Sequence, residues 1–187
     1  MNYCAELKRA MEKLAADNPK TLFVGQGVGT PSTAQTDSFA DIPENQRIEF
    51  PVAEDLQMGF CTGLALDGYL PVSVYPRWNF LLLAANQLIN HLDKLEDYSV
   101  GGYNPKVIIR VGSPSREPFD PGTQHGDDFI TPFMLMLKHI PIFKLHCPMA
   151  VGPAYEHAAA RRGSSILVEY MSCYDAIPSG VPSGAMA

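Results

Sequence analysis

Residues 47–75 read RIEFPVAEDLQMGFCTGLALDGYLPVSVY, and this stretch decides the fold class. Residues 47–50 and 71–75 are short runs rich in apolar side chains, which is typical of strands in a parallel sheet. Between them, residues 55–66 carry apolar side chains at helical spacing. A strand, a helix and a strand in this order predict a unit in which the two strands lie parallel, joined by a right-handed crossover.

The same alternation continues on both sides of this unit. Strand-like runs lie at residues 21–24, 47–50, 71–75, 106–111, 141–145 and 165–169. Helical patterns lie at residues 4–17, 55–66, 79–92, 130–138 and 154–162. Strands that alternate with helices predict a three-layer α/β/α fold with a mostly parallel sheet of about six strands.

Length and charge limit the function classes. The 187 residues suffice for one domain, which we place at 1–178 and follow with a flexible tail at 179–187. The formal net charge is −6, which argues against a nucleic-acid partner because such proteins cluster Lys and Arg along phosphates. Residues 1–17 lack the apolar segment of a signal peptide, and no apolar run reaches membrane-spanning length. We therefore expect a cytoplasmic protein without a membrane partner.

The cysteines give no sign of a metal or disulfide framework. They lie far apart in the sequence, at Cys4, Cys61, Cys147 and Cys173. Neither zinc ligands nor a small disulfide scaffold shows such spacing, so we expect reduced, mostly buried thiols and assign no metal ligand.

Two long irregular segments, residues 25–45 and 112–128, each follow a strand. Ligands of open α/β sheets bind outside the carboxyl ends of the strands, so binding chemistry is expected in these segments. The first begins with Gly25-Gln26-Gly27-Val28-Gly29, which lacks the spacing of a dinucleotide-binding loop and is soon followed by Pro31. We therefore favour a turn over a nucleotide-binding loop at this position.

Several polar and aromatic residues near these strand ends allow two interpretations each. Glu54 is either an acid stabilised by a helix N-terminus or a partly desolvated carboxyl that shares a proton with a ligand nitrogen. His125 is either a solvated loop residue or a substrate contact. The aromatic residues Tyr75, Trp78 and Phe80 either pack in the core or offer a flat ring to a heteroaromatic ligand.

In this order along the chain, these residues resemble the pyrimidine-binding domain of thiamine-diphosphate enzymes. The resemblance is strongest to the beta subunit of 2-oxoacid (pyruvate or branched-chain) dehydrogenase decarboxylase components and weaker to the middle domain of transketolase. It extends from TLFVGQGVG through RIEFPVAEDLQMGFCTGLALDGYLPV and WNFLLLAANQLIN to VIIRVGSP, PGTQH and SSILVEY. The most specific motif is a strand, P-x-x-E, a helix and G-x-A-x-x-G-x-x-P-V.

The resemblance implies a role for each candidate residue. Glu54 would hydrogen-bond N1′ of the cofactor's aminopyrimidine and favour the tautomer that removes the thiazolium proton. Phe80 would pack on the aminopyrimidine, with Trp78 and Tyr75 as the alternatives, and His125 would reach toward the substrate. Gln26 stands among the cofactor-binding residues where dehydrogenase relatives usually carry an acid, so the resemblance gives it no proton-relay role.

The resemblance also implies a partner. The G-D-G…N signature that holds Mg²⁺ and diphosphate is absent from the sequence, so a diphosphate-binding, alpha-type subunit would hold Mg²⁺ and share the thiamine diphosphate, in a dimer or heterotetramer. The substrate would be a small 2-oxoacid, which is decarboxylated, or a ketose, which donates two carbons. Residues Gly126-Asp127-Asp128 replace the usual Ser-Gln after the histidine, which leaves the substrate open.

Two other functions stay open at this point. The chain could be a non-catalytic interaction subunit that keeps the fold, since Gln26 and residues 113–128 depart from the usual pattern. It could also be a stand-alone nucleotide-binding α/β domain that uses residues 25–29.

Overall fold

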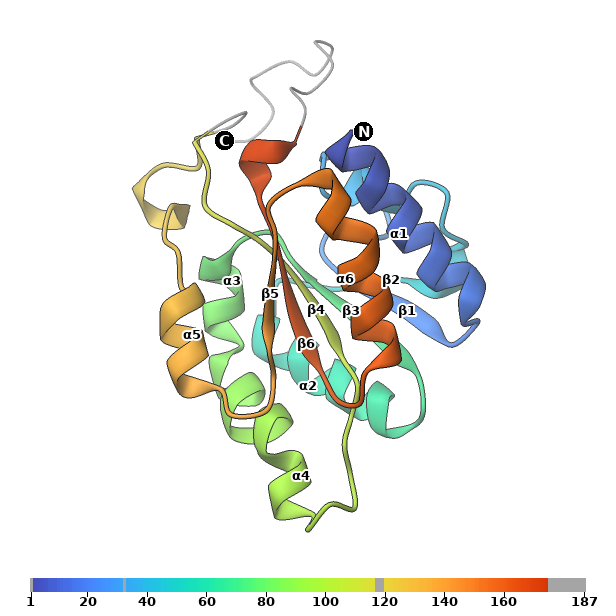
Figure 1. Cartoon of the computed structure of the whole chain (residues 1–187), viewed down its shortest axis with the longest axis vertical. Coiled ribbons are helices and arrows are strands. Elements are labelled where there is room, and N and C mark those ends of the chain that lie inside the picture. Colours follow the sequence, from blue (N-terminus) through green and yellow to red (C-terminus); the bar gives the residue numbers. More distant parts are fainter. Residues whose placement is uncertain (1, 32, 117–119, 175–187) are drawn as a thin grey trace.

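The computed structural model describes residues 2–31, 33–116 and 120–174. Over these residues the chain forms a six-stranded parallel sheet. Figure 1 shows this sheet between layers of helices. The strands are β1 (Thr21–Gly25), β2 (Arg47–Glu49), β3 (Leu70–Tyr75), β4 (Ile108–Gly112), β5 (Ile142–Leu145) and β6 (Ser165–Glu169). They lie in the order β2-β1-β3-β4-β6-β5, and every pairing is parallel. The predicted fold class and all six predicted strands are confirmed.

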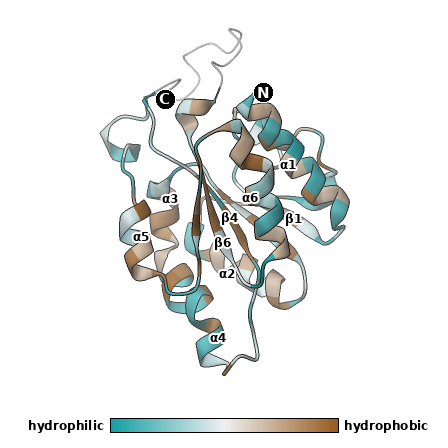
Figure 2. Ribbon diagram, in the orientation of Figure 1, coloured by the Kyte–Doolittle hydropathy of each residue, from teal (hydrophilic) through white to brown (hydrophobic). Residues whose placement is uncertain are grey.

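Helices cover both faces of the sheet. They are α1 (Tyr3–Asp17), α2 (Glu54–Leu66), α3 (Trp78–Leu83), α4 (Leu95–Tyr98), α5 (Ile130–Met136) and α6 (Pro148–Ala160). Helices α1 and α6 pack together on one face, over a core that includes Phe23 and Leu167. Helices α2, α3 and α5 enclose a second core on the other face, around Trp78 and Ile109. Figure 2 shows the apolar central strands between helices whose outer faces are more polar, most clearly on α1.

The predicted helix at 79–92 is broken in the structure. Helix α3 ends at Leu83, a π-helical turn follows at Gln87–His91, and a 3₁₀ turn at Leu92–Lys94 leads into α4. The break turns the carboxylate of Asp93 inward, where it accepts hydrogen bonds from the backbone N–H groups of residues 138, 139 and 140 at 2.8, 2.9 and 3.1 Å. This partner lies far along the chain, so helical periodicity alone does not indicate the break.

Helix α6 begins earlier than predicted. The pattern placed its start at residue 154, after Pro153, whereas the helix begins with Pro148 at its first position. Proline is well tolerated in the first turn because its missing N–H has no helical partner there. Pro153 lies inside the helix and removes one backbone hydrogen bond, and for that reason the sequence pattern favoured a boundary at this point.

A buried ion pair joins β4 to β6. Arg110 and Glu169 are both inaccessible to solvent, and Arg110 Nη2 lies 3.0 Å from Glu169 Oε2. Arg110 also donates to Ser38 Oγ at 2.7 Å and to the carbonyl of Gln35 at 3.0 Å, which anchors the segment after β1 to the sheet. Tyr155 donates to Glu169 at 2.8 Å. The pair therefore fixes a segment that borders the carboxyl edge of the sheet.

Three further expectations have different outcomes. The four cysteines form no disulfide with one another, and only Cys61 is buried, so the expectation of mostly buried thiols is wrong. In the part of the chain that the structure describes, no helix is long and apolar enough to cross a membrane. The predicted tail at 179–187 lies outside the described residues, so the division at residue 178 stays a prediction.

Candidate active site

The predicted site residues gather at one edge of the sheet. Glu54 begins α2 a few residues after β2, Trp78 begins α3 just after β3, and His125 ends a 3₁₀ turn, Thr123–His125, in the segment that follows β4. Because all the strands are parallel, their carboxyl ends meet at this edge. The fold therefore places Glu54 and His125, which are 71 positions apart in the sequence, at the same edge of the sheet.

Glu54 is a buried acid that lacks a complete set of partners. Glu54 is 5% exposed, and its carboxyl oxygen Oε1 is buried without a hydrogen-bond partner. Its position at the first residue of α2 provides favourable interaction with the helix dipole. An unpartnered buried carboxyl oxygen costs free energy, and a hydrogen-bond donor on a ligand would offset that cost.

Other unpartnered polar atoms lie at the same edge. Among the described residues, five buried side-chain nitrogen or oxygen atoms lack a hydrogen-bond partner. Four of them are Glu54 Oε1, Trp78 Nε1, Asn79 Oδ1 and His125 Nδ1, and the fifth is Arg47 Nε. Native proteins rarely leave such atoms unpaired, and their concentration here indicates a ligand site. Asn79 was not predicted, although it immediately precedes the predicted Phe80.

Phe80 and His125 form a stacked pair. Their ring centroids lie 5.0 Å apart with an interplanar angle of 18°, and both residues are partly exposed. Next to this pair, Asn79 Nδ2 donates to Asp127 Oδ2 at 3.1 Å. A cavity of about 360 Å³ beside the turn is lined by residues that include Ser115, Thr123 and Asp127. The structure thus joins the candidate ring and the candidate histidine.

Trp78 and Tyr75 lie in the core. Trp78 is fully buried and packs on Phe133 with ring centroids 5.2 Å apart. Tyr75 is 1% exposed, and its hydroxyl donates to the backbone carbonyl of Glu54 at 3.4 Å. Burial raises the pKa of Tyr75 above its usual range, so the phenol stays a neutral donor. Both rings therefore support the site from beneath, and Phe80 is the ring of the three that is partly exposed.

The glycine loop at residues 25–29 donates backbone hydrogen bonds to a carboxylate of the protein itself. Glu49 accepts hydrogen bonds from the N–H groups of Gly27 and Gly29 at 2.8 and 2.7 Å. Gly27 has a φ of 71°, and a Cβ at Gly25 would lie 2.7 Å from the Val74 carbonyl oxygen, so the turn requires glycine at both positions. No helix opens directly after the loop, and the predicted turn is confirmed.

Gln26 is half-buried in this loop, at the end of β1. The described hydrogen bonds and ring contacts link Tyr75 to Glu54 and Phe80 to His125, and they do not connect Gln26 to either pair. The N–H groups of Gly27 and Gly29 are already bonded to a carboxylate, so they are not free to hold a phosphate. This geometry speaks against the stand-alone nucleotide-binding function.

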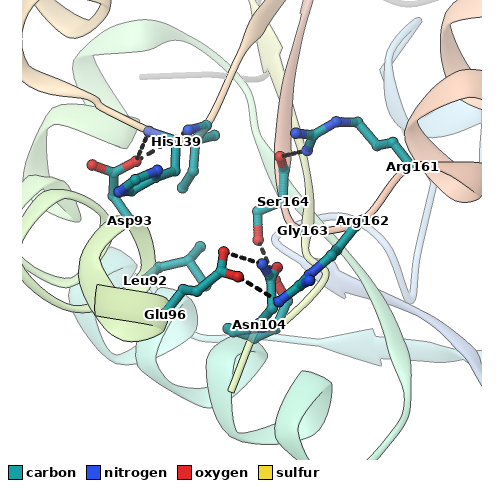
Figure 3. A pocket seen from close by; sticks show the side chains of 11 residues that line it. Leu92, Asp93, Glu96, Asn104, His139, Arg161, Arg162, Gly163 and Ser164 are labelled. Atoms are coloured by element: carbon teal, nitrogen blue, oxygen red, sulfur yellow. Dashed lines mark hydrogen bonds and ion pairs between the residues drawn. The ribbon is translucent and has the colours of Figure 1, made fainter. Parts of the chain in front are cut away.

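A polar cavity of about 270 Å³ lies at the opposite, amino edge of the sheet (Figure 3). Its charged side chains are bonded to one another or to backbone: Glu96 to Arg162 and Asn104, and Arg161 to the Ser164 carbonyl. None of the unpartnered buried atoms in the described chain belongs to this cavity. It is therefore part of the packing between α4 and the strands. Across the described residues, no three His, Cys, Asp or Glu side chains cluster as metal ligands.

Comparison with known proteins agrees with the sequence motifs. No protein-family model matches the chain. The beta subunit of the pyruvate dehydrogenase E1 component from Staurastrum punctulatum is 31% identical over 107 residues, which cover 56% of this chain and 33% of that protein. The 3-methyl-2-oxobutanoate dehydrogenase subunit beta of Mycobacterium tuberculosis (strain H37Rv) is 27% identical over 160 residues, which cover 82% of this chain and 44% of that protein. The chain spans less than half the length of these relatives.

A solved structure shares the fold. It is described as the split-gene transketolase, inactive beta4 tetramer, and it aligns with a TM-score of 0.69 and 18% sequence identity over 89% of this chain and 50% of that chain. The resemblance to beta subunits of 2-oxoacid dehydrogenases, which the sequence motifs predicted, is thus confirmed in sequence. The resemblance to transketolase is confirmed in fold.

Proposed function

We propose that this chain is the pyrimidine-binding, beta-type subunit of a split thiamine-diphosphate enzyme. The observation that carries the proposal is the unpartnered, buried carboxyl oxygen of Glu54 at the first residue of α2, in a chain similar to dehydrogenase beta subunits. The enzyme acts on a 2-oxoacid, which it decarboxylates, or on a ketose, from which it transfers two carbons. It is active only with a diphosphate-binding, alpha-type partner.

Glu54 binds N1′ of the aminopyrimidine through its carboxyl group. When bound, thiamine diphosphate supplies the nucleophilic carbon for the substrate carbonyl. Because Glu54 is 5% exposed, the proton that its carboxyl shares with the ring nitrogen is protected from exchange with water. Tyr75 fixes the backbone at Glu54 through its hydroxyl, and this contact keeps the first turn of α2 in place.

Phe80 offers its partly exposed ring to the aminopyrimidine, and Trp78 holds α3 in the core beneath it. His125, stacked on Phe80, orients the substrate carbonyl or carboxylate. Gln26 borders the cofactor from the end of β1 and carries no titratable group, so it relays no proton. We assign Mg²⁺ and the diphosphate to the partner chain, as the resemblance to beta subunits implies.

An apolar helix face supports assembly with other chains. On α2, Leu56 is 61% exposed, Phe60 39% and Leu66 48%, and Val52 just before the helix is 74% exposed. The opposite face of α2 packs in the core through Met58 and Cys61. Exposed apolar side chains in such a group often mark a protein–protein interface, so we place the partner chain against this face, in a dimer or heterotetramer. The proposed location of this assembly is the cytoplasm.

The direct test is reconstitution of this chain with a diphosphate-binding, alpha-type chain. We expect turnover of a 2-oxoacid or a ketose that depends on thiamine diphosphate and Mg²⁺, and a strong loss of turnover in Glu54→Ala. Full activity of that variant would refute the role of Glu54. A non-catalytic interaction subunit is the competing proposal, favoured by Gln26 in place of an acid, and it predicts an assembly that binds no thiamine diphosphate.

A further inference from the structure

The turn that carries His125 is mostly exposed to solvent. Thr123, Gln124, Gly126 and Asp127 are exposed, and His125 is only partly buried. Such a segment buries few apolar atoms and gains little from the hydrophobic effect, so its position depends on specific contacts. Two side-chain contacts hold it to α3: the stack of His125 on Phe80 and the hydrogen bond from Asn79 to Asp127.

Asp127 differs from the neighbouring acids of the segment. Asp120 accepts from the N–H of Gly122 at 2.9 Å, and Asp128 accepts from the N–H of Ile130 at 2.8 Å, so each caps backbone two residues away. Asp127 instead reaches Asn79, 48 positions earlier in the chain. Its hydrogen bond therefore ties the turn to another element, whereas those of Asp120 and Asp128 shape the local backbone.

The hydrogen bond with Asp127 also fixes the orientation of the Asn79 side-chain amide. An ionised carboxylate only accepts hydrogen bonds, so the NH₂ group of Asn79 faces Asp127 and the amide oxygen faces the other way. That oxygen, Oδ1, is buried and unpartnered. Hydrogen bonds to a charged acceptor are shorter and stronger than neutral ones, which suits a contact that must hold an exposed turn.

We propose that Asn79 and Asp127 are positioning residues that hold the turn at 123–127 on α3 and so keep His125 against Phe80. The importance of this position for catalysis rests on the proposed function, in which His125 contacts the substrate. The hydrogen bond itself is a property of this chain and can be tested without cofactor or partner.

The test is the position of the His125 ring signal in NMR spectra of the full chain, labelled at histidine Cε1. The chain has five histidines, and the spectrum of His125→Gln assigns the signal. Stacking on Phe80 places the His125 ring in the shielding region of that ring, and Phe80→Leu shows where the signal lies without it. We expect Asp127→Ala and Asn79→Ala to move the signal toward the position of a free histidine.

Two variants make the test specific. Asp127→Asn keeps an oxygen that accepts from Asn79, so the signal stays at its wild-type position. Asn90→Ala removes an exposed amide contact of the same kind, between Asn90 and Asn86, away from the turn, and also leaves the signal unchanged. Unchanged methyl and amide dispersion shows that each variant is folded. A His125 signal that stays at the wild-type position in folded Asp127→Ala would overturn the proposal.

Turnover by the reconstituted complex separates this proposal from the proposed function. If both are correct, Asp127→Ala lowers kcat at least tenfold, leaves the KM for thiamine diphosphate unchanged, and Asp127→Asn restores most of the rate. If the NMR signal moves and kcat does not, the positioning role stands and the substrate-contacting role of His125 is wrong. If kcat falls while the signal stays, the positioning role is wrong.

Discussion

Among single residues, Glu54 is a buried acid with an incomplete set of hydrogen-bond partners. Its Oε1 is buried without a partner, whereas the neighbouring Gln57 on the same helix, 1% exposed, donates to the carbonyls of Val24 and Val74 and to Ser73 Oγ. The fold thus supplies hydrogen-bond partners to the side chain of Gln57, whereas Glu54 Oε1 has none. Residues that bind ligands often reduce the stability of the unliganded fold in this manner.

We therefore expect Glu54→Met to raise the free energy of unfolding of the isolated chain by about 1 kcal/mol. Removing an unpartnered buried oxygen relieves about 1–3 kcal/mol, which outweighs the loss of about 0.3–1 kcal/mol of interaction with the helix dipole. The matched variant Gln57→Met leaves two buried carbonyls without their donor and lowers stability by about 1–3 kcal/mol. Urea denaturation measures both. Equal destabilisation by the two variants would contradict this account of Glu54.

At the same scale, the sequence predicted Glu54, Phe80 and His125 because each follows a strand end in a specific motif. It did not predict Asn79 or Asp127. Their hydrogen bond joins residues 48 positions apart and exists only because the segment after β4 docks on α3. No local pattern encodes such a contact, and a pair of polar residues in a loop is ordinarily solvated.

Among the helices and strands, α2 bears most directly on how the chain would assemble with a partner. Its inner side packs through Met58 and Cys61, its outer side exposes Leu56 and Phe60, and its first residue is Glu54. A partner that covers the outer side of α2 also lies near the start of that helix. This arrangement places the proposed interface next to the proposed cofactor contact.

We expect Leu56→Glu to weaken assembly of the chain with its partner by at least about tenfold, or about 1.4 kcal/mol, because it buries a charge in an apolar interface. Leu56 is 61% exposed, so the chain itself folds normally. Val100→Glu is the control, since Val100 is 94% exposed in the turn after α4. Sedimentation velocity of the mixed chains measures assembly. Undiminished assembly of Leu56→Glu would show that the partner binds elsewhere.

The elements also show where sequence patterns succeed and fail. All six strands were predicted because each is a short apolar run between turns, as a sheet covered on both faces requires. The break after α3 was missed because its cause, the burial of Asp93 beneath residues 138–140, is a tertiary contact. The start of α6 was missed because Pro153 lies within the helix.

At the scale of the whole molecule, a cluster of tyrosines around Glu169 links α1, α6 and the segment after β6. Tyr155 and Tyr174 both donate to Glu169, and Tyr3 lies against Tyr174 with ring centroids 5.7 Å apart. Burial, and then the charge of Glu169, raise the pKa values of all three tyrosines above their usual range. The folded chain therefore keeps these protons at a pH where the unfolded chain loses them.

This difference gives the sign of the pH dependence. Unfolded tyrosines titrate near pH 10, so the contribution of the cluster to stability is complete below about pH 10 and falls as the pH rises further, by up to about 1.4 kcal/mol per pH unit for each tyrosine. Urea denaturation across this range measures the slope. In Tyr155→Phe one titrating group is gone, and we expect a shallower slope. An unchanged slope in that variant would contradict the assignment of the effect to this cluster.

In the proposed complex, Glu54 of this chain binds the aminopyrimidine of thiamine diphosphate. Calorimetric titration of thiamine diphosphate, with Mg²⁺, into the assembled complex tests it most directly, with Asp55→Ala as the control because Asp55 is the exposed acid next to Glu54. We expect saturable binding to the wild-type and Asp55→Ala complexes, and an affinity that is weaker by up to about tenfold for Glu54→Ala. Equal affinity for Glu54→Ala, or an assembled wild-type complex that binds no cofactor, would contradict it.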